Sequence, residues 1–298
     1  MAAPKADGRA LAALAVLTLL WGYTWIIAKQ ALDYAGPFHV GFLRTAMATL
    51  ALFGALLAMR RPLRPQAVLK TAAVGLFQTG GFIALSTWAL VEGGAGKTAV
   101  LVFTMPIWTL LLARLVLRER IRPSQWAAAA CSLVGLILIV APWNLHASLL
   151  SKVLAILAAL SWALSTILVK RWRDALSGDV LALTTWQMLF GLLPLLAVLA
   201  FVPERSTQWT PAFAGIIGFM AVVSTAFGWF LWLYVLERLP AWQASLSILG
   251  IPGVAIVSSH LQLGERTDPG ELAGMLLIGL GLVTISVLNW RSQRRMRC

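Results

Sequence analysis

The sequence is built from long apolar runs, each about as long as the roughly 20 residues that a helix needs to cross a bilayer. Ten runs follow one another, and the breaks between them are short and carry proline or charged residues. The runs lie near residues 10–32, 38–59, 67–90, 95–117, 124–142, 149–170, 180–202, 211–236, 242–263 and 270–290. Because no stretch between them is long enough for a soluble domain, we predict an all-α integral membrane protein with ten transmembrane helices.

The composition excludes an ordinary soluble protein and indicates a lipid bilayer as the surroundings. Apolar residues make up 60% of the chain and charged residues only 12%, whereas soluble proteins carry about 25% charged residues. A net charge of +13 would suggest nucleic acid in a soluble protein. Here the basic residues gather at the ends of the apolar runs, as they do in membrane proteins, so we expect no nucleic acid as a partner.

The basic residues also predict how the chain crosses the membrane. One side would receive the two termini and the loops after the second, fourth, sixth and eighth spans. That side holds three quarters of the 24 Lys and Arg residues. Since cytoplasmic loops are enriched in these residues, we expect both termini in the cytoplasm. The first run extends well beyond the core of a signal peptide, so we expect it to remain as the first span.

Residues 91–100, VEGGAGKTAV, look like a phosphate-binding loop. Such a loop needs a glycine five positions before Gly96, where the chain has Val91. The stretch also lies between two apolar runs and on the predicted outer side. We therefore expect no nucleotide here, but a tight turn and close helix packing. Lys97 begins a span, which leaves open an attraction for anionic groups.

The two halves of the sequence repeat one pattern. LWGYTWIIAK at residues 20–29 aligns with LSWALSTILVK at 160–170, so that Trp21 falls on Trp162. Further along, MPIWTLLLARLVLRERIRPSQW at 105–126 aligns with IPGVAIVSSHLQLGERTDPGEL at 251–272.

The second alignment pairs Pro106 with Pro252 and Glu119 with Glu265. Each half then holds five spans, and because five is odd, the second copy enters the membrane from the opposite side. We predict two inverted five-helix repeats, residues 1–146 and 147–298. Inverted repeats are typical of carriers that work by alternating access, with the substrate near the midplane.

These motifs resemble the ten-span exporters of the drug/metabolite transporter superfamily, the EamA-type group. The likeness covers nearly the whole chain and rests on LLWGYTWIIAKQAL, FLRTAMATL with Arg44, and the closing LRERIRP and LGERTDP. A narrower likeness is to the bacterial aromatic amino-acid exporters. The resemblance implies a secondary transporter that exports amino acids, aromatic ones among them, or similar small metabolites across the bacterial inner membrane. A multidrug or other metabolite exporter of the same superfamily is the alternative.

Several aromatic and polar residues are candidates for the lining of a substrate cavity. A tryptophan near the centre of a span needs a partner for its N–H, so it should face protein or a cavity. The resemblance implies that spans 1, 3, 4, 6, 8 and 9 line the cavity. We expect these residues to bind substrate: Trp21, Trp25, Gln78, Trp108, Trp162 and Trp229. Ordinary packing between helices is the alternative for each.

The sequence indicates a role for two prolines and several charged residues less strongly. Pro106 and Pro252 interrupt helix hydrogen bonding within spans and are candidate bend points for gating. We expect Glu265 to pair with a neighbouring arginine at a span end. Arg44 and Lys29 either attract a substrate carboxylate or extend to the interface.

The sequence gives little support for other classes of function. A membrane enzyme needs a catalytic or metal-binding cluster, and the three histidines and two cysteines are scattered. We therefore expect no enzyme, no metal and no cofactor. The acidic residues lie at span ends, so uniport, exchange and proton antiport all remain open. An inverted repeat argues against a channel, and one chain with two halves can form a complete pathway as a monomer.

Overall fold

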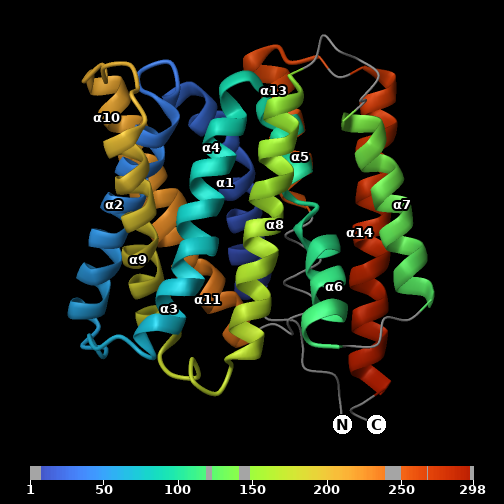
Figure 1. The fold of residues 1–298 in the computed structure, drawn as a ribbon, viewed down its shortest axis with the longest axis horizontal. Helices are drawn as coiled ribbons and strands as arrows, with labels where there is room; N and C mark the ends of the chain where they lie inside the picture. Colours follow the sequence, from blue (N-terminus) through green and yellow to red (C-terminus); the bar gives the residue numbers. More distant parts are fainter. Residues whose placement is uncertain (1–7, 119–122, 141–147, 239–249, 267, 296–298) are drawn as a thin grey trace.

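In the computed structural model, the described residues are 8–118, 123–140, 148–238, 250–266 and 268–295, and they form a bundle of helices with no strand among them (Figure 1). Within the described part of the chain, seven helical segments are long and apolar enough to cross a membrane. They are Gly8–Ala31, Pro37–Ala58, Val68–Glu92, Ala95–Val116, Leu149–Arg171, Val180–Phe201 and Pro211–Trp232. The other three predicted spans contain α7 (Pro123–Val140), α13 (Gly250–Leu263) and α14 (Pro269–Arg295). The described part of the chain is thus all-helical, with helices of a length and composition suited to crossing a membrane.

The remaining elements are the following, in chain order. They are α1 (Gly8–Ala31), α2 (Pro37–Ala58), α3 (Val68–Gly75), η1 (Leu76–Gly81), α4 (Phe82–Glu92), α5 (Ala95–Val102), α6 (Met105–Val116), α8 (Leu149–Arg171), α9 (Val180–Phe201), α10 (Pro211–Gly218), η2 (Phe219–Phe227) and α11 (Gly228–Arg238).

The starts of several helices follow from local chemistry. Pro37 and Pro211 stand in the first turns of α2 and α10, where a missing N–H removes no helix hydrogen bond. The side chain of Asp179 accepts a hydrogen bond from the N–H of Ala182 at 2.9 Å, which caps α9. Thr210 caps α10 in the same way, with 3.1 Å between its hydroxyl oxygen and the nitrogen of Phe213.

Two of the long helices contain a π-helical segment in their middle. One runs α3–η1–α4 and the other α10–η2–α11, and they fall in the third and eighth predicted spans. Each π segment has a carbonyl that accepts a hydrogen bond from another helix. Phe77 O in η1 accepts from the Ser161 hydroxyl of α8 at 2.7 Å, and Ser224 O in η2 accepts from the Trp21 indole of α1 at 3.0 Å. Such π segments often occur at functional sites.

The fourth predicted span is broken into two helices. α5 ends at Val102 and α6 begins at Met105, so the break falls on Phe103 and Thr104. Pro106 lies in the first turn of α6, where a proline is tolerated. Pro252 lies at the corresponding place in α13, and the residues that precede Gly250 are outside the described part of the chain.

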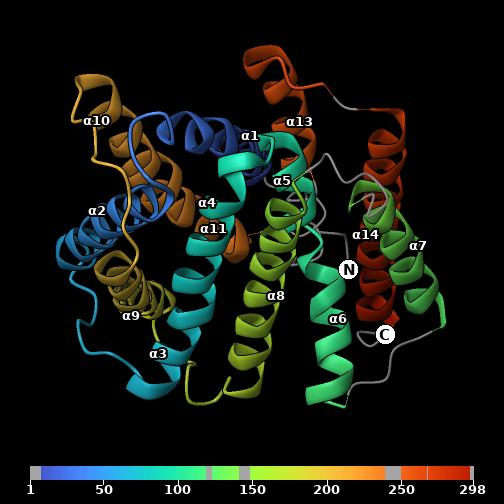
Figure 2. The same ribbon diagram turned by 45° about the horizontal axis from the view of Figure 1, so that its top comes forward.

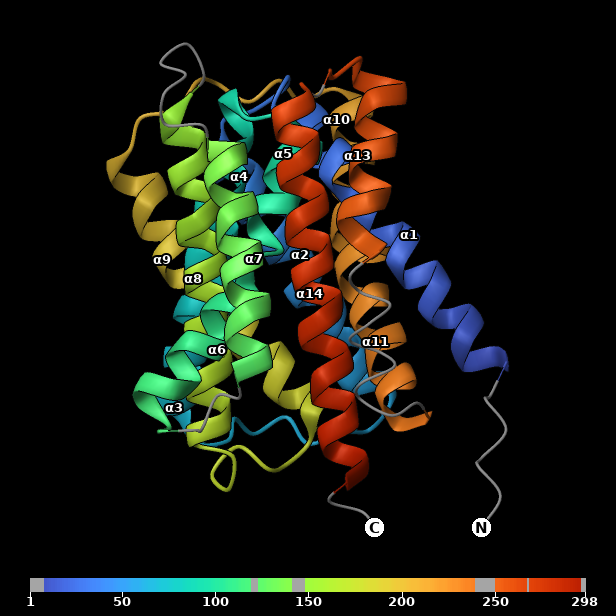
Figure 3. The same cartoon turned by 90° about the vertical axis from the view of Figure 1, so that its right-hand side faces the viewer.

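Glycine allows the closest helix contacts. A Cβ atom at Gly75 of α3 would collide with the carbonyl oxygen of Gln187 on α9. α7 and α14 lie side by side (Figure 3), and a Cβ atom at Gly135 would lie 2.5 Å from the carbonyl oxygen of Gly274. Small residues at such contacts are how helices associate in membranes.

The bundle has two distinct ends (Figures 1 and 2). The loops 59–67 and 172–179 lie at the same end as the start of α1 and the end of α14, and we call this the basic end. The loops 32–36, 93–94, 202–210 and 264–266 lie at the opposite end, which we call the capped end.

Candidate functional site

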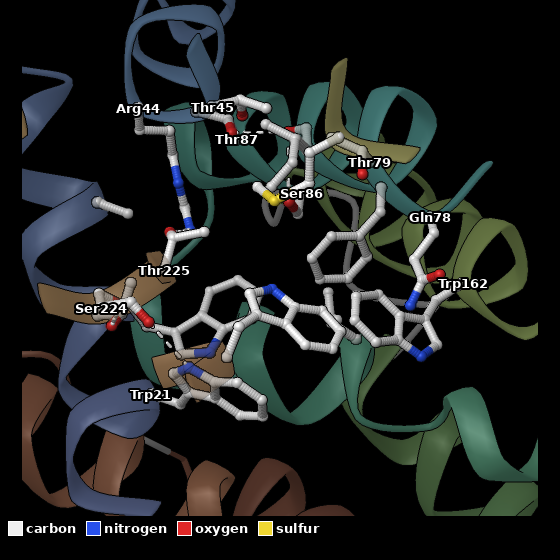
Figure 4. Close-up of a pocket in the computed structure, with 18 of the residues that line it drawn as sticks. Trp21, Arg44, Thr45, Gln78, Thr79, Ser86, Thr87, Trp162, Ser224 and Thr225 are labelled. Carbon is white, nitrogen blue, oxygen red and sulfur yellow. Dashed lines mark hydrogen bonds between the residues drawn. The ribbon is translucent and has the colours of Figure 1, made fainter. Parts of the chain in front are cut away.

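A cavity of about 290 Å³ lies inside the bundle (Figure 4). Side chains from α1, α2, η1, α4, α8, α9, η2, α11 and α13 line it, together with residues around the α5–α6 break. Aromatic and aliphatic side chains form most of its walls, and nine hydroxyl and amide side chains and one arginine also line it. An apolar surface with individual polar groups set in it is typical of small-molecule sites.

Five of the six residues predicted for a substrate cavity line this one. They are Trp21, Trp25, Gln78, Trp162 and Trp229. The chain thereby brings together residues from α1, η1, α8 and α11 that are far apart in the sequence.

Trp108 is not among the residues that line the cavity. It lies on α6, where its indole N–H donates to the hydroxyl of Thr104 at 3.0 Å, and its ring packs against buried apolar residues that include Ile107. From this span, the residues around the break between α5 and α6 line the cavity instead: Val102, Phe103 and Met105.

The tryptophans form much of the wall on one side. The ring of Trp21 lies 6.2 Å from that of Trp229 and 6.2 Å from that of Trp232, measured between centroids. On the other side, the rings of Phe82 and Trp162 meet edge to face at 4.8 Å. These are favourable aromatic geometries, and they fix flat apolar surfaces around the space.

Hydrogen bonds between α1 and η2 hold one part of the wall in place. The Trp21 indole donates to Ser224 O at 3.0 Å. The hydroxyl of Thr24 also forms a hydrogen bond with the hydroxyl of Ser224 and donates to Leu20 O at 2.6 Å. The sequence already showed Ser224 as a polar residue within an apolar run, but nothing in it indicated α1 as the partner.

Two amide side chains face the cavity without using their hydrogen-bonding groups. Gln187 on α9 is only 4% exposed, and its amide forms no hydrogen bond with another described residue. Gln78 on η1 likewise has no such partner. Because neither amide has a hydrogen-bond partner among the described residues, both are available to a ligand.

Arg44 on α2 is the only charged side chain among the described residues that line the cavity. Figure 4 shows its side chain extending toward Thr225. Its Nη2 donates to the hydroxyl oxygen of Thr225 at 3.3 Å. α2 and α9 lie outside the set of spans that the family resemblance implied. The sequence left open whether Arg44 attracts a substrate carboxylate or extends to the interface, and Gln187 was not among the predicted cavity residues.

The capped end is held together by charged side chains at helix termini. The carboxylate of Glu265 accepts hydrogen bonds from the N–H groups of Ala95 at 2.6 Å and Gly96 at 3.2 Å, at the start of α5. We expected an arginine partner for Glu265, and it caps a helix instead, because the positive end of a helix attracts a carboxylate. The carboxylate occupies the position that an anionic ligand would take at this glycine-rich turn.

Lys29 and Glu204 act in the same way at this end. The ammonium of Lys29 donates to the carbonyl oxygens of Leu90, Val91 and Gly93 at 2.5, 3.0 and 3.1 Å, where α4 ends. Glu204 accepts from the N–H groups of Phe38 and His39 at 2.8 Å each, where α2 begins. Lys29 does not line the cavity, so its position supports a structural role.

Comparison with known proteins shows which family the chain matches. The model of the EamA-like transporter family matches residues 8–141 and, a second time, residues 149–287. A relative in Salmonella typhimurium, named "Probable amino-acid metabolite efflux pump", is 29% identical over 95% of this chain and 96% of its own length. A "Probable terminal-alkyne amino-acid exporter" of Streptantibioticus cattleyicolor is 27% identical over 97% of this chain and 96% of its own.

A relative in Bacillus subtilis, named "Uncharacterized transporter YoaV", is 28% identical over 89% of this chain and 92% of its own. One solved crystal structure matches the fold with a TM-score of 0.64 at 16% sequence identity, over 94% of this chain and 98% of that chain. That likeness concerns the fold alone.

Proposed function

The chain belongs to the EamA-like transporter family, and on that premise we propose that it is a secondary transporter that exports amino acids or similar small metabolites by alternating access. The observation that carries this proposal is the cavity of about 290 Å³, with aromatic walls and one arginine, inside the helix bundle. Two relatives are named for amino-acid export. Aromatic amino acids fit these walls best, because flat apolar rings favour contact with a ring of the substrate.

The proposal includes ten spans arranged as two inverted repeats, residues 1–146 and 147–298. Three observations support it. The family model matches each half, and the π segments η1 and η2 fall in corresponding spans. The first helix of each half also contacts the π segment of the other, through Trp21 to Ser224 O and through Ser161 to Phe77 O.

The proposed route crosses the bacterial inner membrane, with both chain termini in the cytoplasm. The arginines of loops 59–67 and 172–179 lie at one end of the bundle with the start of α1 and the end of α14. Since basic loops are retained in the cytoplasm, this end would face inward and the capped end outward. One chain holds both halves, so a monomer suffices for the pathway.

Alternating access requires places where helices can bend. The two π segments, the break at Phe103 and Thr104, and the prolines Pro106 and Pro252 supply them. Backbone carbonyls at such places are not all satisfied within the helix. Movement there would open one end while the other closes.

The alternative within the superfamily is a multidrug exporter, and the cavity favours the amino-acid reading. Its volume of about 290 Å³ lies near the lower limit of the roughly 300–1,000 Å³ that ligand pockets span. The described residues that line it include no Asp or Glu, and a cationic drug would lack a carboxylate partner there.

The test is counterflow with the purified protein in liposomes. Vesicles loaded with unlabelled amino acids would be given labelled ones across a panel, first without and then with a proton gradient. We expect saturable exchange, strongest for aromatic amino acids, and none in vesicles without protein. Flux that does not saturate, or exchange of cationic drugs but not of amino acids, would contradict the proposal.

A further inference from the structure

Arg44 is a cation whose hydrogen-bonding capacity is largely unused. A guanidinium carries five N–H donors, and this one has a single hydrogen bond, to Thr225 at 3.3 Å. No carboxylate of a described residue pairs with it. Arg44 is partly buried, and a charge withdrawn from water without a partner is unfavourable, so a ligand that brings a carboxylate to this position would gain an ion pair.

The π segment η2 orients the guanidinium. Thr225 donates its hydroxyl hydrogen to Met220 O, five residues earlier, at 2.8 Å. Its oxygen is thereby left as the acceptor for Arg44. One edge of the guanidinium is held by this contact, and the donors that remain are free for the paired hydrogen bonds that a carboxylate forms with arginine.

The neighbouring polar groups are neutral. Figure 4 shows Thr45 and Thr87 on the same side of the cavity as Arg44. Each donates its hydroxyl hydrogen to a carbonyl of its own helix at 2.7 Å, to Gly41 O and Ile83 O respectively. These oxygens can accept a hydrogen bond, but they carry no charge. An ammonium group in this cavity would therefore face Arg44 without any opposing carboxylate from the described lining.

The aromatic walls lie away from Arg44. Figure 4 shows Trp21 below it and Trp162 on the far side of the cavity. Arg44 and the aromatic residues line the same cavity of about 290 Å³, so a molecule with a carboxylate at one end and a ring at the other offers a partner to each. The faces of tryptophan rings can also bind a cation, so the experiment below includes a cationic compound.

We propose that Arg44 is the carboxylate anchor of the transported molecule, and that the cavity selects small aromatic carboxylates for which a charged amino group is dispensable. This inference rests on the proposed function as a carrier and narrows its substrate class. It predicts that an aromatic acid without an amino group binds at least as well as the corresponding amino acid.

The test uses four molecules with one phenyl ring and different charges: 3-phenylpropionate, phenylalanine, phenylalaninamide and phenethylamine. Binding is measured first, as the rise in unfolding temperature of the purified chain in detergent, since a ligand stabilises the state that binds it. Exchange in liposomes is measured second. We expect the two carboxylates to stabilise and exchange, and the amide and the amine to do neither.

Variants locate the effect. Arg44→Gln should raise the half-saturating concentration of 3-phenylpropionate by about tenfold or more, because the charge-assisted hydrogen bonds are lost. Arg44→Lys should have a smaller effect, since it keeps the charge but not the paired geometry. Arg61→Gln is the matched control: it removes a cation at the basic end, where Arg61 pairs with Asp179, and should leave binding unchanged.

Equal stabilisation by phenethylamine, or none by either carboxylate, would overturn the inference. The wild-type series decides this even if Arg44→Gln fails to fold. Carboxylate binding without exchange would leave Arg44 as an anchor and overturn the carrier function. Exchange of phenylalanine together with equal binding of phenylalaninamide or phenethylamine would leave the carrier function standing and overturn Arg44 as the carboxylate anchor.

Discussion

The capped end and the cavity use charged side chains in opposite ways. At the capped end, Lys29 binds three carbonyl oxygens, Glu265 binds two backbone N–H groups, and Lys97 pairs with Glu271 at 2.6 Å. In the cavity, Arg44 has one hydrogen bond at 3.3 Å. Charge at the capped end joins helices to one another, whereas most of the hydrogen-bond donors of the cavity arginine have no partner among the described residues.

Several of the capped-end contacts also join the two predicted halves. Glu204 and Glu265 belong to residues 147–298, and the helix starts that they bind, in α2 and α5, belong to residues 1–146. A carrier that opens at this end must break such contacts, so they should affect stability and movement more than substrate affinity. Substitutions of the cavity residues should affect substrate affinity more than stability and movement.

The largest effect on transport should come from the cavity wall. Trp162→Ala removes the ring that meets Phe82 at 4.8 Å, and we expect exchange to fall by about tenfold or more, since a lost aromatic contact of this kind costs well above 1 kcal/mol. Counterflow in liposomes measures it. Trp126→Ala is the matched control, because Trp126 is 48% exposed on α7 and outside the cavity. Equal losses of exchange in both variants would mean that a tryptophan of the cavity matters no more for transport than an exposed one.

A change at the helix cap should come next and should act on stability. Glu265→Ala deprives the first turn of α5 of its acceptor, which should cost about 1–2 kcal/mol of unfolding free energy. Thermal unfolding in detergent measures this, and substrate-induced stabilisation should persist. Glu92→Ala removes a carboxylate at the same end whose partner is the Ser148 hydroxyl at the surface; it should cost clearly less. A loss of substrate binding in Glu265→Ala would place this carboxylate in the binding site instead.

Lys29→Gln should have a smaller effect of the same kind. It weakens the capping of the carbonyls of Leu90, Val91 and Gly93, and we expect about 1 kcal/mol of lost stability. The concentration of substrate that half-saturates exchange should not change. A rise in that concentration would instead favour Lys29 as an attractor of substrate carboxylates.

Arg61→Gln at the basic end should have the smallest effect. Arg61 lies 3.2 Å from Asp179 and is half exposed, and exposed ion pairs contribute about 0–1 kcal/mol. Thermal unfolding should shift little, and less still at high salt. A large loss of stability would mean that the basic end, like the capped end, depends on its charged contacts.

Much of the fold could be predicted from the sequence, because bilayer crossing leaves a signal in every span. Each predicted span contains a described helix, and the interruption near Pro106 was predicted from the proline itself. The alignment of Trp21 with Trp162 also placed two residues that line the same cavity. These features depend on local chemistry or on internal repetition, and both are visible in one sequence.

The failures share one physical cause, which is that a partner far away in the chain decides the role of a residue. Trp108 was assigned to the cavity by its depth, but its ring packs against a buried apolar cluster and it is not among the residues that line the cavity. Glu265 finds its partners at Ala95 and Gly96, and nothing near it in sequence indicates them. Gln187 lines the cavity from α9, a helix that the family resemblance did not include. For Arg44 on α2 the sequence left two roles open, and only the fold places its side chain at the cavity.

The most direct test of the cavity as the substrate site is protection of a cysteine inside it. Ser86 lines the cavity and is 6% exposed, so Ser86→Cys, in a chain in which Cys131 and Cys298 are replaced by alanine, reports on that space. Ser177→Cys, in the exposed loop before α9, is the control. With substrate at ten times its half-saturating concentration, we expect alkylation by N-ethylmaleimide to slow about tenfold for Ser86→Cys and not at all for Ser177→Cys. A substrate that exchanges in liposomes but leaves the rate at Ser86→Cys unchanged would contradict the assignment of this cavity.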